Sequence, residues 1–326
     1  MCKQIRIGII GCANIAKKYL IPAFQALSDS FFVVGVASRS VSRANEFKKL
    51  FNVAVFDSYD ELIAHREIDA VYIPLPNGLH YQYVKEAIKN GKHVLVEKSI
   101  ACTSLEVITL NRMAQENNLV LLENFQFRFH RQLKEIQQII SGGKIGDIRT
   151  IRSSFGFPPF EDKSNIRYQK KLGGGALLDA GAYPIKISTV LMGSKVDISS
   201  AKLFIDEDLD IDLWGAATIE SIESVVCSQI AFGFDNYYQC SLEVWGATGK
   251  ISAPRVFTAP PGFTAKILIE KQGAIRTIEV PPDNHFINML EHFHSLITTE
   301  KSKTAEYEQN VLQSKLIEQV KEKAFG

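Results

Sequence analysis

Short apolar runs alternate with segments of helical period along the first 123 residues of the chain. Each run has the length of a β-strand and is apolar throughout rather than at every second position. Continuous apolar strands are typical of a parallel sheet, because helices cover both of its faces. The runs are Ile5–Ile10, Phe32–Ala37, Val53–Phe56, Ala70–Ile73, His93–Val96 and Leu119–Leu122. Six strands separated by five helices predict an α/β domain with a doubly wound parallel sheet.

Local signals mark where several of these helices begin and end. Ser58-x-x-Glu61 and Thr103-x-x-Glu106 have the spacing of capping boxes, in which the side chains at the helix start satisfy free backbone amides. Gly91 follows a helical segment from about Leu79 to Asn90, at the position where glycine commonly ends a helix.

The pattern changes after about residue 124. Strand-length pieces now alternate apolar and polar residues, which is typical of an antiparallel sheet with one covered face. Helices are expected at His130–Ser141, from the Gly173-Gly174-Gly175 triplet to about Met192, and at Phe286–Thr298 and Ala305–Lys323. Strands are expected at Ile148–Phe155, Val225–Phe232, Tyr237–Trp245, Ala265–Glu270 and Arg276–Val280. We therefore predict a dinucleotide-binding domain at residues 1–123 and an α+β domain at 124–326 with a large, mostly antiparallel open sheet.

Composition narrows the function classes. The 326 residues carry 37 Lys and Arg against 36 Asp and Glu, a net charge of +1 that disfavours a nucleic-acid binder. No apolar run approaches the roughly 20 residues that span a bilayer, and no export signal is expected. The odd cysteine count and the absence of C-x-x-C disfavour disulfides and a metal site and favour the cytoplasm. The cysteines are Cys2, Cys12, Cys102, Cys227 and Cys240.

The turn after the first strand, from Gly11 to Ala16, is a candidate phosphate-binding turn. A dinucleotide fingerprint needs a glycine for the tight turn and small residues where the backbone approaches the pyrophosphate. Only the first glycine is present, and Ala13 and Ala16 occupy the other two positions. The strand–turn–helix setting nevertheless favours a dinucleotide, held by the residues of the turn. These are Gly11, Cys12, Ala13, Asn14 and Ile15.

The end of the second strand predicts which dinucleotide binds. An NAD site places a carboxylate there, whereas this chain has Ser38 and Arg39, with Arg43 four residues beyond Arg39. A hydroxyl and guanidinium groups bind a 2′-phosphate that a carboxylate would repel. The sequence therefore predicts NADP(H) rather than NAD(H).

Two further segments follow predicted parallel strands, at the carboxyl edge where open α/β sheets bind ligands. One runs from Pro74 to His80 and supplies Leu75, Asn77 and His80; the other ends in Glu97-Lys98. The Glu-Lys pair should point at the reactive end of the cofactor.

The segments 69–98, 123–130 and 173–184 resemble, in order, three motifs of the glucose–fructose oxidoreductase/inositol dehydrogenase/MocA (Gfo/Idh/MocA) family of nicotinamide-dependent oxidoreductases. The motifs are D-A-V-x-I-x-x-P-N-x-x-H…G-K-H-V-x-x-E-K-P, E-x-F-x-x-R-F-H-P and G-G-G-x-L-x-D-x-G-x-[HY]. The resemblance implies an N-terminal Rossmann domain and a C-terminal domain whose open sheet forms a homodimer or homotetramer. One departure is Ser99, where the family usually has proline.

The resemblance assigns catalytic roles to Lys98 and Tyr183. Many members have histidine where this chain has Tyr183, and the chain looks most like the NDP-sugar 3-ketoreductases, which share Gly11–Ala16 and Ile166–Pro184. It implies an NADPH-dependent reductase of a keto group on a sugar and favours a nucleotide-linked keto-deoxysugar, with Tyr183 as proton donor and Lys98 assisting. The alternatives are an NADP-dependent dehydrogenase of free sugars or trans-dihydrodiols, and a non-catalytic NADP-binding sensor.

The remaining site residues flank these motifs. Asn124 and Arg167 are expected beside the cofactor, and Arg128 beside the substrate. Asp179 would share the face of Tyr183 on an unbroken helix and could hold a sugar hydroxyl, unless it caps the helix. Lys186 could reach a substrate diphosphate. The alternating acids from Asp206 to Asp212 are interpreted as a solvated strand face rather than a cation site.

Overall fold

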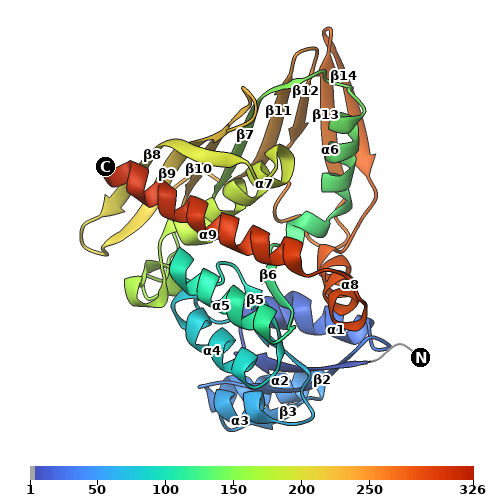
Figure 1. Cartoon of the computed structure of the whole chain (residues 1–326), viewed down its shortest axis with the longest axis vertical. Coiled ribbons are helices and arrows are strands. Elements are labelled where there is room, and N and C mark those ends of the chain that lie inside the picture. The colour runs from blue at the N-terminus through green and yellow to red at the C-terminus, as the bar shows by residue number, and fades with distance from the viewer. Residues whose placement is uncertain (1–3) are drawn as a thin grey trace. The chain divides into compact units, whose positions relative to one another are not determined.

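The computed structural model describes residues 4–326, and the chain divides into two compact units (Figure 1). Met1–Asn124 and Phe286–Val311 form the first unit, and Phe125–His285 and Leu312–Gly326 form the second. The first unit thus combines the N-terminal part of the chain with residues 286–311. Cys2 lies outside the described residues.

The first unit contains a six-stranded sheet in the order β3-β2-β1-β4-β5-β6, and every pair of neighbours is parallel. The order reverses beside β1, which is the topology of a doubly wound sheet and confirms the predicted fold class. The central strand β4 is buried at all four positions, as a continuous apolar strand should be. The strands are β1 Ile5–Ile10, β2 Phe31–Ala37, β3 Ala54–Phe56, β4 Ala70–Ile73, β5 His93–Glu97 and β6 Leu121–Asn124.

Helices connect these strands, and side-chain caps fix where two of them begin. Thr103 and Glu106 form the predicted capping box at the start of α5. At α3 the box is half-formed: Ser58 accepts from the Glu61 amide at 3.0 Å, but the Glu61 carboxylate accepts from the amide of Asp57. The helices of this unit are α1 Ile21–Ala26, α2 Val41–Phe51, α3 Tyr59–Ala64, α4 Asn77–Lys89, α5 Ser104–Glu116, α8 His285–Thr298 and the first part of α9 Thr304–Phe325.

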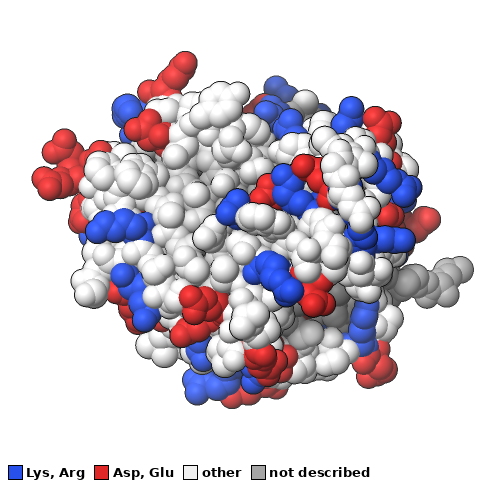
Figure 2. All heavy atoms as spheres, turned by 90° about the horizontal axis from the view of Figure 1, so that it is seen from above, with Lys and Arg blue, Asp and Glu red and all other residues white. Residues whose placement is uncertain are grey.

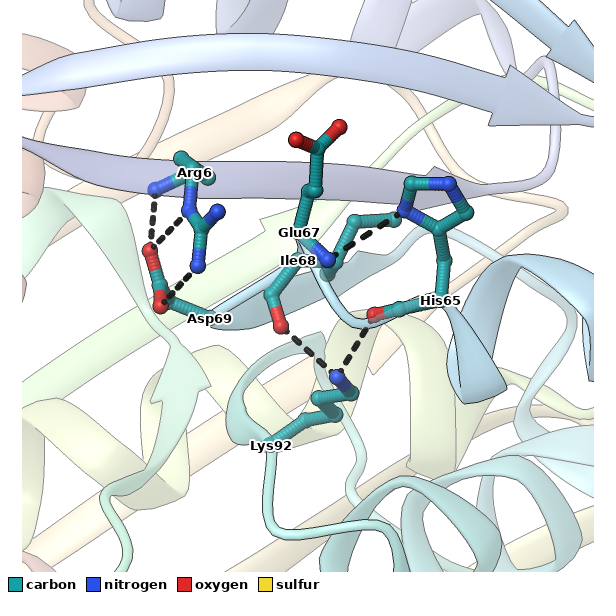
Figure 3. A network of polar contacts seen from close by, with 6 residues as sticks. All are labelled: Arg6, His65, Glu67, Ile68, Asp69 and Lys92. Carbon is teal, nitrogen blue, oxygen red and sulfur yellow. Dashed lines mark hydrogen bonds and ion pairs between the residues drawn. The ribbon is translucent and has the colours of Figure 1, made fainter.

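The amino edge of this sheet is tied together by two polar groups (Figure 3). Arg6 on β1 forms a bidentate pair with Asp69, at 2.9 and 3.0 Å. Lys92 is 7% exposed and donates to the carbonyl oxygens of His65 and Ile68, at 2.9 and 2.7 Å. A buried ammonium needs such acceptors, so these contacts hold the entries to β4 and β5 at the edge opposite the candidate site.

The second unit contains an eight-stranded sheet in the order β14-β13-β12-β11-β7-β10-β9-β8. Its neighbours are antiparallel except for β7 and β10, which confirms the predicted mostly antiparallel sheet. The short strand β12 and the β8–β9 hairpin complete it. The strands are β7 Ile148–Gly156, β8 Val196–Asp206, β9 Ile211–Ser221, β10 Cys227–Gly233, β11 Gln239–Gly246, β12 Lys250–Ala253, β13 Ala265–Lys271 and β14 Ala274–Val280.

Helices α6 Arg131–Ser141 and α7 Ala182–Met192 belong to this unit, and a π-helical turn at Leu177–Gly181 leads into α7. His130 caps α6, since its Nδ1 accepts from the Gln132 amide at 3.0 Å. Helix α7 is almost wholly buried along its first two turns, from Ala182 to Ser188. It therefore packs onto one face of the sheet. Because only that face is covered, buried and exposed positions alternate along the strands.

The surface carries charges of both signs. Figure 2 shows a face on which Lys and Arg side chains lie among Asp and Glu side chains around a broad uncharged area. Within residues 4–326, no helix is long and apolar enough to cross a membrane. The same residues contain no cluster of three or more His, Cys, Asp or Glu that could hold a metal ion.

Candidate active site

The turn between β1 and the first helix is built for close approach of a ligand to the backbone. Gly11 has φ +113°, and a Cβ there would lie 2.8 Å from the Leu75 side chain, so only glycine fits without movement. The Gly11 amide donates to Ala37 at 2.9 Å, which ties the turn to the end of β2. Cys12 is 7% exposed, and burial raises the pKa of its thiol to about 11. Asn14 is exposed at the start of the helix, where backbone N–H groups can donate hydrogen bonds to a bound anion.

The end of β2 carries basic groups and no carboxylate. Ser38 accepts from the Ser40 amide at 3.1 Å, and Ser40 in turn caps α2 by accepting from the Arg43 amide. Arg39 and Arg43 are both exposed. The Arg43 charge lowers the pKa of the Cys12 thiol, against the larger effect of burial, so its field reaches the turn that follows β1.

Glu97 joins three neighbouring strands at the carboxyl edge. Its Oε1 accepts hydrogen bonds from the Tyr72 hydroxyl and from the side-chain amide of Asn124, each at 2.6 Å. Tyr72 lies on β4 and Asn124 on β6, so this carboxylate on β5, the strand between them, is held from both sides. This network fixes the backbone from which Lys98 leaves the sheet.

Lys98 itself is 9% exposed, and the Lys98–Ser99 peptide bond is cis. His80 holds this segment: its ring nitrogens lie 2.7 Å from the carbonyl oxygens of Ser99 and Leu75. Burial, followed by the nearby Lys98 charge, lowers the pKa of His80 to about 4. The ring is therefore neutral at pH 7 and carries a single N–H, so it donates a hydrogen bond to one of these two carbonyl oxygens.

A buried neutral histidine makes stability depend on pH. The unfolded chain takes up a proton near pH 6.5 and the native chain only near 4, so stability is complete above 6.5 and is lost as the pH falls through that window. Between pH 7 and pH 5 the free energy of unfolding should fall by about 2 kcal/mol more in the wild type than in His80→Asn. Urea unfolding at both pH values measures this, and equal losses in the two proteins would contradict it.

In the second unit, Tyr183 lies on α7 inside a ring of phenylalanines. Four ring centroids lie within 6 Å of it: Phe125 at 5.6 Å, Phe127 at 5.8 Å, Phe155 at 4.9 Å and Phe257 at 5.5 Å. The tyrosine is 7% exposed. An aromatic wall of this kind holds the phenol in one orientation and excludes water from around it.

Arg167 and Asp179 form an ion pair in the same unit. The Arg167 guanidinium donates to the Asp179 carboxylate and stacks 5.1 Å from the Phe160 ring centroid. The pKa of Arg167 is raised, chiefly by Asp179, and Tyr183 makes a smaller contribution in the same direction. Arg167 therefore lies within electrostatic reach of the phenol. Asp179 lies in the π-helical turn, so its four-residue spacing from Tyr183 is not that of an unbroken α-helix.

Asp212 stabilises the start of the helical segment that carries Asp179 and Tyr183, a role that the sequence pattern does not predict. The acids near it were expected on a solvated strand, but the Asp212 carboxylate accepts from the Leu177 amide and caps the helix that carries Asp179 and Tyr183. Gly175 has φ +112°, and a Cβ there would lie 2.4 Å from Asp212 Oδ1. Burial raises the pKa of Asp212. The glycine triplet could have indicated this contact, because Gly175 has no side chain and leaves room for the Asp212 carboxylate.

Two expected substrate residues lie close to aromatic rings. Lys186 is 1% exposed, and its Nζ lies 4.9 Å from the centroid of Phe125, one of the phenylalanines that surround Tyr183. Arg128 is partly buried and stacks 5.2 Å from the Phe129 ring centroid. Each unit thus brings its own expected residues together: the cofactor residues along the carboxyl edge of the parallel sheet, and Tyr183, Arg167, Asp179 and Lys186 around α7.

Two models of one protein family match successive parts of the chain. Residues 5–125 match the model of the oxidoreductase family with an NAD-binding Rossmann fold, GFO/IDH/MocA. Residues 133–252 match the model of the GFO/IDH/MocA C-terminal domain.

Individual relatives match over nearly the whole chain. A dTDP-3,4-didehydro-2,6-dideoxy-alpha-D-glucose 3-reductase from Actinomadura kijaniata is 33% identical, over 97% of this chain and 95% of its own. The reductase of the same name from Saccharopolyspora spinosa is 34% identical, over 87% and 85%. Among solved structures, a 3-ketoreductase from Actinomadura kijaniata in complex with NADP and TDP-benzene superposes with a TM-score of 0.94, at 33% identity over 98% of both chains.

Proposed function

The chain belongs to the Gfo/Idh/MocA family of oxidoreductases, and we propose that it is an NADPH-dependent reductase of the keto group of a nucleotide-linked keto-deoxysugar. The observation that carries the proposal is its end-to-end likeness to a 3-ketoreductase that was crystallised with NADP and a TDP compound. Fold alone would not support a substrate, because this fold serves many reactions. The likeness extends through both the cofactor unit and the unit that carries Tyr183.

The first unit fits NADPH. The turn at Gly11 to Ile15 offers backbone amides and a position that excludes a side chain, as a diphosphate requires. Ser38, Arg39 and Arg43 offer a hydroxyl and two guanidinium groups where an NAD site has an acid. When bound, NADPH supplies a hydride from C4 of its nicotinamide. We assign the rest of the cofactor-binding surface to the carboxyl-edge residues and to Arg167. The carboxyl-edge residues are Leu75, Asn77, His80, Glu97, Lys98 and Asn124.

The catalytic roles that we propose fall to Tyr183 and Lys98. As the ketone is reduced, its oxygen gains negative charge and takes up one proton. Tyr183 donates that proton from its phenol, and the Lys98 ammonium stabilises the charge that develops on the oxygen. Arg167 lies within electrostatic reach of Tyr183 and stabilises the phenolate that remains. Asp179 fixes Arg167, and Arg128 and Lys186 complete the substrate side of the site.

Membership of this family also suggests how the protein assembles and in which compartment it works. We propose a cytoplasmic homodimer or homotetramer that assembles through the eight-stranded sheet, with residues 1–123 and 124–326 as the cofactor and substrate domains. Free cysteines at positions 12, 102, 227 and 240 support a reducing compartment. Exposed apolar side chains on the strands of the sheet, such as Phe204, Trp214 and Trp245, support a face that a second copy covers.

The experiment follows NADPH consumption by absorbance with three substrate classes. These are nucleotide-linked keto-deoxysugars, free sugars, and dicarbonyls as small carbonyl substrates. Turnover confined to the nucleotide-linked ketones is the expected result. Turnover of free sugars, or NADPH formation in a parallel assay that supplies NADP and a trans-dihydrodiol, would instead indicate a dehydrogenase. Tight NADPH binding without turnover of any class would favour a sensor.

A further inference from the structure

An arginine of the loop between β12 and β13 is held rigidly between two aromatic rings. The Arg255 guanidinium lies 6.0 Å from the Tyr238 ring centroid and 5.4 Å from that of Phe263. Its Nε donates to the Thr258 carbonyl at 3.1 Å. In the described chain, no acidic side chain pairs with Arg255, and its two terminal nitrogens make no hydrogen bond. The guanidinium is therefore oriented but not neutralised.

The loop around Arg255 is itself anchored. Gln132 of α6, which is 1% exposed, donates to the carbonyl oxygens of Arg255 and Val256 at 3.1 and 3.3 Å. The Phe257 amide donates to Cys240 Sγ on β11 at 3.4 Å. These contacts fix the backbone on both sides of the arginine, so that little conformational entropy is lost when it binds an anion.

This anchored loop also supplies part of the wall around Tyr183. Phe257, two residues after Arg255, has its ring centroid 5.5 Å from that of Tyr183. Two residues span at most about 7 Å of chain, so the Arg255 backbone lies within about 7 Å of the Phe257 backbone. Thr258 continues the cluster, with its hydroxyl 3.2 Å from the Tyr238 hydroxyl.

We propose that Arg255 binds the diphosphate of the nucleotide-linked sugar and so selects nucleotide-linked over free sugars. The inference rests on the proposed function, because it names what that substrate site recognises. A guanidinium with two terminal nitrogens unused can form a bidentate pair with a phosphate, and flanking aromatic rings preserve its orientation. Lys186, by contrast, is 1% exposed and its Nζ lies 4.9 Å from the Phe125 ring centroid, so it is less accessible to a diphosphate than Arg255.

The test compares steady-state kinetics of Arg255→Gln, Arg255→Lys and the control Arg276→Gln, which changes an exposed arginine on β14. Glutamine keeps the aliphatic stem and a donor for the Thr258 carbonyl but removes the charge. With the nucleotide-linked ketone, Arg255→Gln should raise KM about 10- to 100-fold and change kcat less than about 3-fold. Inhibition by dTDP should weaken by the same factor. The KM of Arg255→Lys should lie between those of the wild type and Arg255→Gln, and the KM of Arg276→Gln should equal that of the wild type.

The outcomes separate this inference from the function it rests on. An unchanged KM in Arg255→Gln, with wild-type turnover intact, overturns the inference and leaves the reductase. A KM rise in Lys186→Met but not in Arg255→Gln overturns it in favour of Lys186. A wild type that neither turns over the nucleotide-linked ketone nor is inhibited by dTDP overturns both proposals. Thermal unfolding of each variant checks that the loop still folds.

Discussion

Replacing Tyr183 by phenylalanine is expected to lower kcat by about 10²- to 10⁴-fold, the range for loss of a general acid. The change removes one oxygen from a ring already packed among four phenylalanines, so the aromatic wall should survive. Binding of NADPH should remain within about 2-fold of the wild type. Steady-state kinetics at saturating substrate and NADPH fluorescence titration measure the two quantities.

Tyr168→Phe is the matched control for this variant. Tyr168 is 6% exposed in the same unit, and its hydroxyl accepts from the Phe160 amide at 2.9 Å. Removing that hydroxyl deletes a buried hydrogen bond and should destabilise the protein by about 1 kcal/mol while sparing kcat. If Tyr183→Phe and Tyr168→Phe have equal kcat values, Tyr183 is not the proton donor.

Replacing Arg39 by alanine is expected to lower the preference for NADPH over NADH by about 10- to 100-fold. The change removes a charge-assisted contact worth about 1.5–3 kcal/mol with the 2′-phosphate and leaves the NADH contacts in place. Arg39 is exposed at the carboxyl edge, so its loss should not disturb the core. The ratio of kcat/KM values for the two cofactors reports the effect.

Arg66→Ala gives the control for charge alone. Arg66 is also an exposed arginine of the first unit, but it lies in the loop before β4, at the amino edge of the sheet. Its removal should leave the cofactor ratio unchanged. An unchanged ratio in Arg39→Ala as well would mean that Ser38 and Arg43 recognise the phosphate without Arg39.

The doubly wound sheet could be predicted because its information is local. Strands buried on both faces are apolar at every position, and β4 is an example that needs no knowledge of its neighbours. The capping box at Thr103 is local in the same sense, since both partners lie within one turn. The six predicted strands accordingly match the observed ones to within two residues at each end.

The features that the sequence did not predict depend on contacts between distant segments. Asp212 caps a helix that begins 35 residues earlier, and nothing in its alternating neighbours distinguishes it from a solvated acid. The π-helical turn at Leu177–Gly181 changes the face that Asp179 shares, although its spacing from Tyr183 is that of an α-helix. The Arg255 guanidinium packs against the rings of Tyr238 and Phe263, which lie on two different loops. Tertiary packing rather than local pattern decides each of these.

The most direct test of hydride transfer to the sugar is the fate of deuterium when both hydrogens on C4 of NADPH are replaced by deuterium. The protein is incubated with the labelled cofactor and a dTDP-linked 3-keto-deoxysugar, and the product is examined by NMR and mass spectrometry. One deuterium per molecule is expected on the former ketone carbon of the sugar, and almost none with Tyr183→Phe over the same period. A wild-type product without deuterium, or an unchanged ketone in the presence of bound NADPH, would contradict it.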